Sequence, residues 1–153
     1  MISSVIRMID CHIVCRKNNE IKYLLLKRAP KKIYPNIWQC VTGKIENNEK
    51  AYLTAIREVQ EETKLTAIKL WTVEHVNSFF EARQNRMNLI PVFGMEVNNT
   101  NVILSHEHTD YVWCDINIAR EKLLWNQQKI GLLVFHDMLN GSKEKLSFSE
   151  ISL

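Results

Sequence analysis

The sequence contains no apolar run long enough to cross a membrane. Its longest apolar stretches, such as YLLL and IGLLVF, fall far short of the ~20 residues that a membrane helix needs. The N-terminus MISSVIRMIDCHIV carries one early arginine, and Asp10 and His12 interrupt its apolar pattern, so it makes a poor signal peptide. We therefore expect a cytoplasmic protein that does not associate with membranes.

Cysteine pairs at metal-binding spacing are also missing. The four cysteines include no C-x-x-C pair, and a zinc site would need more ligands at tighter spacing. Cys11 and Cys15 lie four residues apart in a segment that is typical of a strand, so both should point to one face. We expect reduced, partly buried thiols rather than disulfides or a metal site.

A strong charge of either sign is absent as well. Twenty basic residues oppose seventeen acidic ones, and this excess is too small to indicate nucleic-acid binding by itself. The bases are nevertheless clustered, because LLLKRAPKK places Lys27, Arg28, Lys31 and Lys32 within six residues. Two interpretations remain open: a solvated loop, and a binding site for the phosphates of a small anionic substrate.

Only four glycines and three prolines punctuate the 153 residues, and no repeat is visible. This length fits one domain, which we place at 1–141, followed by a polar tail over 142–153 that we expect to be frayed. The patterns predict an α/β fold with a mixed sheet. Strands are expected near 4–17, 21–28, 37–43, 67–80, 88–97 and 111–116, and helices near 48–64, 117–125 and 127–140.

The helix predicted near 48–64 has Asn47 or Asn48 as its expected cap. It carries an unusual group of carboxylates. Glu58, Glu61 and Glu62 should share one face, where like charges repel and where the helix C-terminus is unfavourable for acids. A solvated acidic face is one interpretation. The other is a divalent-cation site, because Mg²⁺ binds carboxylate and carbonyl oxygens and often bridges to substrate phosphates. A glycine ahead of the helix would let a backbone carbonyl turn inward as a further ligand.

This stretch resembles the Nudix box, G-x5-E-x7-R-E-U-x-E-E-x-G-U, in which U is aliphatic. One position departs from the pattern, because Lys64 stands where the family has glycine, and a lysine there must adopt a left-handed conformation unless the helix ends differently. The matching residues are Gly43, Glu49, Arg57, Glu58, Val59, Glu61, Glu62 and Leu65.

The resemblance implies a Nudix α/β/α sandwich with a central mixed sheet. It also implies Mg²⁺-dependent hydrolysis, with Mn²⁺ as a possible substitute, of a nucleoside diphosphate linked to a further group. Glu61 and Glu62 would bind metal together with a carbonyl near Gly43, and Glu58 would bind metal or act as the base. Arg57 and Glu49 would pair and orient the helix. Metal ions in such sites neutralise phosphate charge and activate water.

Two flanking segments are similar to the dihydroneopterin triphosphate and dATP pyrophosphohydrolases of this family. WQCVTG ends at Gly43, and EHTDYVW contains Glu107, which the resemblance makes a further metal ligand or base. A plain loop acid, and a transition-metal site formed by His106 and His108, are the alternatives. Trp38, Phe79 and Phe80 could stack a flat ring or fill the core, and Lys27 and Arg28 are candidate substrate-binding residues.

The leading expectation is a pyrophosphohydrolase that converts a (deoxy)nucleoside or dihydroneopterin triphosphate to the monophosphate and pyrophosphate. A hydrolase of dinucleoside polyphosphates or nucleotide sugars such as ADP-ribose is the second interpretation. A nucleotide-binding Nudix module without turnover is the third. The expected partner is a small phosphoanhydride rather than nucleic acid, and the chain would be a monomer or homodimer.

Overall fold

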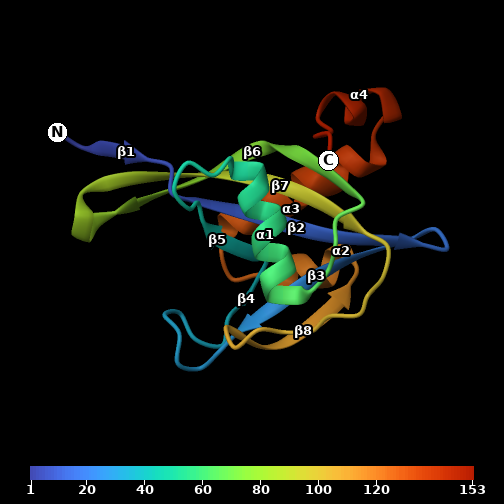
Figure 1. The fold of residues 1–153 in the computed structure, drawn as a ribbon, viewed down its shortest axis with the longest axis horizontal. Coiled ribbons are helices and arrows are strands. Elements are labelled where there is room, and N and C mark those ends of the chain that lie inside the picture. The colour runs from blue at the N-terminus through green and yellow to red at the C-terminus, as the bar shows by residue number, and fades with distance from the viewer.

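A computed structural model describes all 153 residues and shows a mixed sheet between helices (Figure 1). The sheet has the order β1-β7-β2-β3-β4, with β5 also paired to β2, β6 to β7 and β8 to β3. Its strands are β1 Ser3–Val5, β2 Met8–Lys17, β3 Glu20–Arg28, β4 Trp38–Gln39, β5 Val41–Lys44, β6 Lys69–Glu81, β7 Arg86–Val97 and β8 His108–Cys114. The helices are α1 Ala51–Thr63, α2 Ile116–Lys122, α3 Asn126–Asn140 and α4 Lys143–Phe148, with a 3-10 turn η1 over Ala82–Gln84.

Alternation along the central strands creates two separate cores. On β2, Ile9 and Cys11 belong to the core beneath α1, whereas Val14 belongs to the core beneath α3. Neighbouring residues of a strand point to opposite faces, so one strand contributes to both cores. Figure 1 shows α1 and α3 separated by the strands. The expected α/β/α sandwich is therefore confirmed, and Cys11 and Cys15 share the α1 core as free, buried thiols.

One edge of β2 is shared by two strands, and this arrangement positions the loop that leads into α1. The first half of β2 pairs with β5 through Met8–Cys11, and its second half pairs with β3 through Ile13–Lys17. Two different strands therefore use the same edge of β2, one after the other. β5 carries Gly43 next to Ile9 in this register, and α1 crosses back over the same strands, with Ala55 and Val59 buried against them.

The start of α1 differs from the sequence prediction. The helix begins at Ala51 with Lys50 as its N-cap, and no side chain caps it. Asn48 instead takes a left-handed conformation with a φ of 57° in the preceding turn, so the predicted asparagine cap is wrong. The side chain of Glu49 is turned away from the helix end toward Thr54 and Arg57. The Glu49 side chain therefore pairs with Arg57 and does not cap the first N–H groups of α1.

Two further predictions are corrected at the chain ends. The first predicted strand is divided into β1 and β2 by Ile6 and Arg7, so that β1 pairs with the far part of β7. The tail is not frayed, because Ser142 caps α4 and the Ile151 N–H bonds to the Leu70 carbonyl. None of the four helices is both long and apolar enough to cross a membrane.

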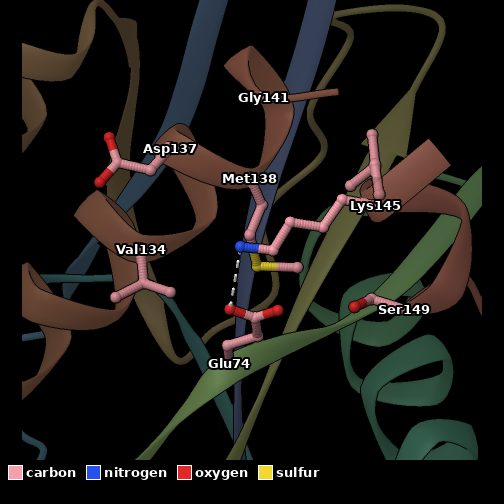
Figure 2. Close-up of a pocket in the computed structure, with 8 residues that line it drawn as sticks. Glu74, Val134, Asp137, Met138, Gly141, Lys145 and Ser149 are labelled. Carbon is pink, nitrogen blue, oxygen red and sulfur yellow. Dashed lines mark ion pairs between the residues drawn. The ribbon is translucent and has the colours of Figure 1, made fainter. Parts of the chain in front are cut away.

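A cavity of about 230 Å³ lies between β6, α3 and α4. Figure 2 shows Lys145 extended across it toward Glu74, with an ion-pair distance of 3.8 Å, while Asp137 lies on α3. None of the residues predicted to act in catalysis or binding lines it. Because α3 and α1 cover opposite faces of the sheet, this cavity is on the other side of the sheet from the carboxylates of α1.

Lys64 occupies the position where the Nudix box has glycine. It ends α1 with a φ of 62°, which is the left-handed conformation predicted for a residue at this position. That conformation costs a residue with a Cβ about 1–2 kcal/mol, and the greater freedom of glycine in the unfolded chain offsets part of the gain. We expect Lys64→Gly to raise the free energy of unfolding by about 0.5–1 kcal/mol, as measured by urea denaturation.

The matched control is Lys64→Ala, which removes the lysine side chain but keeps the Cβ atom. Alanine should leave the stability close to that of the wild type. If alanine stabilised the protein as much as glycine, the effect would come from the lysine side chain rather than from backbone strain.

Candidate functional site

The carboxylates of α1 do not form the uniform face that the sequence predicted. The side chain of Glu61 is 58% exposed and that of Glu58 is 13% exposed, whereas Glu62 is buried with the core residues of the helix. Glu62 therefore lies where the acidic face meets the apolar face. Burial of a carboxylate without a partner is costly, so this placement calls for a specific neighbour.

Arg57 joins the loop before α1 to the helix. Its Nε and Nη2 donate to the two carboxylate oxygens of Glu49 at 2.9 and 3.0 Å, and Nη1 donates to Glu58 at 2.9 Å. Nη2 also donates to the Lys44 carbonyl at 3.0 Å. Hydrogen bonds from Arg57 lower the pKa of Glu49 to about 2. A two-pronged pair of this kind fixes orientation as well as charge, so Arg57 holds Glu58 in place relative to β5.

Gly43 is required by the close approach of Glu58 rather than by an unusual backbone conformation. Its φ is not positive, so the backbone conformation at Gly43 is open to other residues. A Cβ atom at Gly43 would lie 2.2 Å from Cγ of Glu58. Any larger residue would therefore displace the Glu58 side chain from its contact with Arg57.

Glu62 lies close to His108, the first residue of β8, and to Glu107 in the loop just before it. One ligand atom each from Glu62, Glu107 and His108 lie within 4.8 Å of one another, and Glu62 and His108 are buried. Burial raises the pKa of Glu62 to about 10, and the carboxylates of Glu107 and Glu58 contribute to this increase. Its hydrogen bond with Glu62 lowers the pKa of Glu107. Without a cation, one proton is thus shared between two adjacent carboxyl groups.

The same group of residues fits a divalent cation. Oε2 of Glu62 is buried and has no hydrogen-bond partner, which leaves it free to bind a cation. Glu58 is close enough to affect the pKa of Glu62, and burial raises its own pKa. Hard cations prefer such carboxylate oxygens, and the removal of the shared proton would provide the negative charge.

The basic loop lies next to Glu107. A hollow of about 430 Å³ is lined by Ala29, Pro30, Lys31, Lys32 and His106. The Ala29 N–H bonds to the Glu107 carbonyl at 2.9 Å and so ties the two loops together. Lys32 is also near enough to help lower the pKa of Glu107.

The predicted substrate-binding residues have other contacts. Nε of Arg28 donates to the Ile33 carbonyl at 2.8 Å, which shapes the basic loop, and Lys27 is paired in register with Trp38 on β4. The Lys122 ammonium lies 4.9 Å from the centre of the Trp38 ring. Phe79 and Phe80 are 46% and 49% exposed, near the end of β6, so they do not fill the core.

A polar cluster beside α3 was missed by the sequence analysis. Asn77 donates a short hydrogen bond to the buried Asp10, whose pKa burial raises to about 7. Nε2 of the buried His12 has no partner, and His75 bonds to Gln127 at 3.1 Å. The interruption of the apolar pattern by Asp10 and His12 is the signal in the sequence that marks this cluster.

Comparison with known proteins identifies the fold family. The family model described as NUDIX domain matches residues 7–133. The chain belongs to the Nudix family. The asymmetrical bis(5'-nucleosyl)-tetraphosphatase of Caenorhabditis elegans is 31% identical over 103 residues, which are 65% of this chain and 72% of that protein. The resemblance to the Nudix box is therefore confirmed. The chain is a Nudix hydrolase that acts on pyrophosphate bonds.

Other similarities are to a longer relative and to solved structures. An octanoyltransferase of Myxococcus xanthus is 28% identical over 120 residues, which are 76% of this Nudix chain, and the chain spans only 33% of that protein. A C. elegans Ap4A hydrolase in a binary complex has a TM-score of 0.73 at 24% identity, with 92% and 100% of the two chains covered. The Escherichia coli dihydroneopterin triphosphate pyrophosphohydrolase has a TM-score of 0.67 at 22% identity, with the same coverage.

Glu62→Gln tests the buried carboxyl. With a folded-state pKa near 10 and an ordinary value of 4.5, the native protein keeps a proton that the unfolded chain loses. The metal-free wild type should therefore lose stability as the pH rises from about 4.5 toward 10, with a slope of at most ~1.4 kcal/mol per pH unit. We expect Glu62→Gln to flatten this slope and to be the more stable protein at pH 8 in EDTA.

Added Mg²⁺ should make the wild type the more stable protein. Its ionised Glu62 carboxylate can bind the cation, whereas the glutamine of the variant carries no charge. Thermal unfolding with and without Mg²⁺ measures both effects. Glu61→Gln is the matched control, since Glu61 is exposed and should change the metal-free stability little. A wild-type slope that persists in Glu62→Gln would contradict the assignment.

Proposed function

We propose that this Nudix hydrolase cleaves a pyrophosphate bond in a dinucleoside polyphosphate. The observation that carries the proposal is the contact between the basic loop and the loop of Glu107, which the hydrogen bond from the Ala29 N–H to the Glu107 carbonyl ties together. This contact places the hollow lined by Lys31, Lys32 and His106 next to the group formed by Glu62, Glu107 and His108. A phosphate chain that extends across Glu107 would meet the bases directly and the carboxylates through a cation.

Each residue of the site then has a separate task. Glu62 and Glu107 would hold the cation, with Glu61 at the exposed edge, and Lys31 and Lys32 would bind phosphate oxygens. A divalent cation, when bound, neutralises phosphate charge and makes water a stronger nucleophile. Arg57 would keep Glu58 oriented through its 2.9 Å hydrogen bond. Either Glu58 or Glu107 would accept the proton from the attacking water.

An exposed pair of aromatic rings supports the dinucleoside substrate over the triphosphate. The basic hollow is open to solvent on the loop that also carries Tyr34, and Tyr34 contacts Trp125 edge-to-face with ring centres 5.1 Å apart. Both rings are exposed, at 55% and 39%. Exposed aromatic rings of this kind can stack a base. The name of the C. elegans relative, an asymmetrical tetraphosphatase, points to the same substrate class.

The (deoxy)nucleoside or dihydroneopterin triphosphate expected from the flanking motifs remains the second candidate. Its support is the similarity of the segments around Trp38 and Glu107 to those of the pyrophosphohydrolases. The solved dihydroneopterin triphosphate enzyme is only 22% identical, which is evidence for the fold alone. The triphosphate would use the same cation and proton acceptor but would bring one ring system to the site, where a dinucleoside polyphosphate brings two.

A product assay with Mg²⁺ in ¹⁸O-labelled water distinguishes these substrates. The panel contains diadenosine tetraphosphate, dATP, the other nucleoside triphosphates, dihydroneopterin triphosphate and ADP-ribose. We expect diadenosine tetraphosphate to give ATP and AMP with the highest kcat/KM, and a Glu61→Gln/Glu62→Gln double variant to be inactive. Faster conversion of a triphosphate to a monophosphate and pyrophosphate would favour the second candidate.

The proton acceptor can be identified with Glu58→Gln and Glu107→Gln. Substitution of the general base should lower kcat by at least ~10²-fold with little change in metal affinity. Substitution of a metal ligand should instead raise the Kd for the cation. Measuring both quantities for both variants separates the two roles. The base assignment would be wrong if neither substitution lowered kcat by that factor.

A further inference from the structure

The ligand group at the start of β8 contains a nitrogen donor as well as carboxylates. A ring nitrogen of His108 lies within 4.8 Å of the carboxylate oxygens of Glu62 and Glu107. These three residues come from α1, the preceding loop and the first residue of β8. The following inference rests on the metal-dependent function proposed above, but it concerns which cation the site selects.

His108 has one ring nitrogen with a partner and one without. The ring is 4% exposed, and Nε2 lies 3.0 Å from the side-chain amide of Gln39, which is itself buried. Nδ1 is buried and has no hydrogen-bond partner. Buried polar atoms normally have a partner, so each exception needs an explanation. Oε2 of Glu62 is the other unpartnered atom in the same group.

The backbone holds this histidine firmly. His108 is paired with Arg28 on β3, next to an irregularity in the register between Lys27 and Arg28. The adjacent Glu107 carbonyl accepts the Ala29 N–H at 2.9 Å. A ligand that is fixed by a strand and a buried amide keeps its geometry without a bound ion.

We propose that His108 Nδ1 is a metal ligand and that it biases the site toward Mn²⁺-type first-row cations over Mg²⁺. Imidazole nitrogen is a better ligand for first-row transition cations than for Mg²⁺, which prefers oxygen, and Mn²⁺ is the first-row cation that also suits carboxylate oxygens. Gln39 is then a positioning residue. Its amide oxygen would accept the Nε2–H of His108 and leave the Nδ1 lone pair free, and a half-turn of the amide provides this arrangement.

His106 does not share this role. It is exposed and lines the basic hollow with Lys31 and Lys32, away from the unpartnered atoms. The two-histidine site considered from the sequence is therefore replaced by one histidine with two carboxylates. This difference makes His106 the natural control for His108.

The first test is pulsed EPR of Mn²⁺ bound to the metal-free, full-length wild-type protein, prepared with either ¹⁴N- or ¹⁵N-labelled histidine. We expect coupling from one directly bound histidine nitrogen that changes with the isotope. The coupling should persist in His106→Gln and disappear in His108→Gln. Bound Mn²⁺ without histidine coupling in the wild type would overturn the proposal, even if His108→Gln failed to fold.

Calorimetric titration measures the selectivity. His108→Gln and His108→Asn should raise the Kd for Mn²⁺ at least about tenfold and change the Kd for Mg²⁺ less than threefold. Gln39→Leu should weaken Mn²⁺ binding in the same direction, whereas His106→Gln should change neither cation. Equal losses for the two cations would contradict selection by nitrogen.

These outcomes are separable from failure of the proposed function. Metal-dependent turnover without histidine coupling would overturn only the role of His108. Absence of binding by either cation in the wild type, confirmed by unchanged thermal stability, would overturn both proposals.

Discussion

The buried carboxyl group of Glu62 is the constraint on which the site depends. Three carboxyl groups meet there, those of Glu58, Glu62 and Glu107, and they cannot all be ionised at such short range without a cation or a proton between them. The metal-free protein resolves this by keeping Glu62 protonated beside an ionised Glu107. A cation resolves it by replacing the proton, so metal binding and proton release are coupled.

Rigid supports keep this unfavourable arrangement in place. Arg57 connects Glu58 to Glu49 and to the Lys44 carbonyl, and Gly43 leaves the space that the Glu58 side chain occupies. Both supports depend on β5, whose position follows from the division of the β2 edge between β5 and β3. The fold thus places the residues before any ligand is present, which reduces the reorganisation needed for catalysis.

The sequence predicted those features that depend on residue type and spacing. The box residues, the helix, the two-faced strands and the left-handed Lys64 could all be read from it. Burial could not, because Glu58, Glu61 and Glu62 share a spacing but differ in what packs over them. The positions of Lys31 and Lys32 next to Glu107 depend on a backbone bond between two loops that are distant in sequence. The ordered tail likewise depends on pairing with β6.

Charge separation within a nearly neutral chain explains why a phosphate chain suits this surface. Lys32 and Glu62 are both close enough to Glu107 to affect its pKa, so an anion that binds the lysines is brought toward other anions. Only a cation makes both contacts favourable at once. If one ligand of that cation is the His108 nitrogen, the site supplies a neutral donor beside its carboxylates. The cation then keeps more of its positive charge for the phosphate oxygens than it would with a further carboxylate in place of the imidazole.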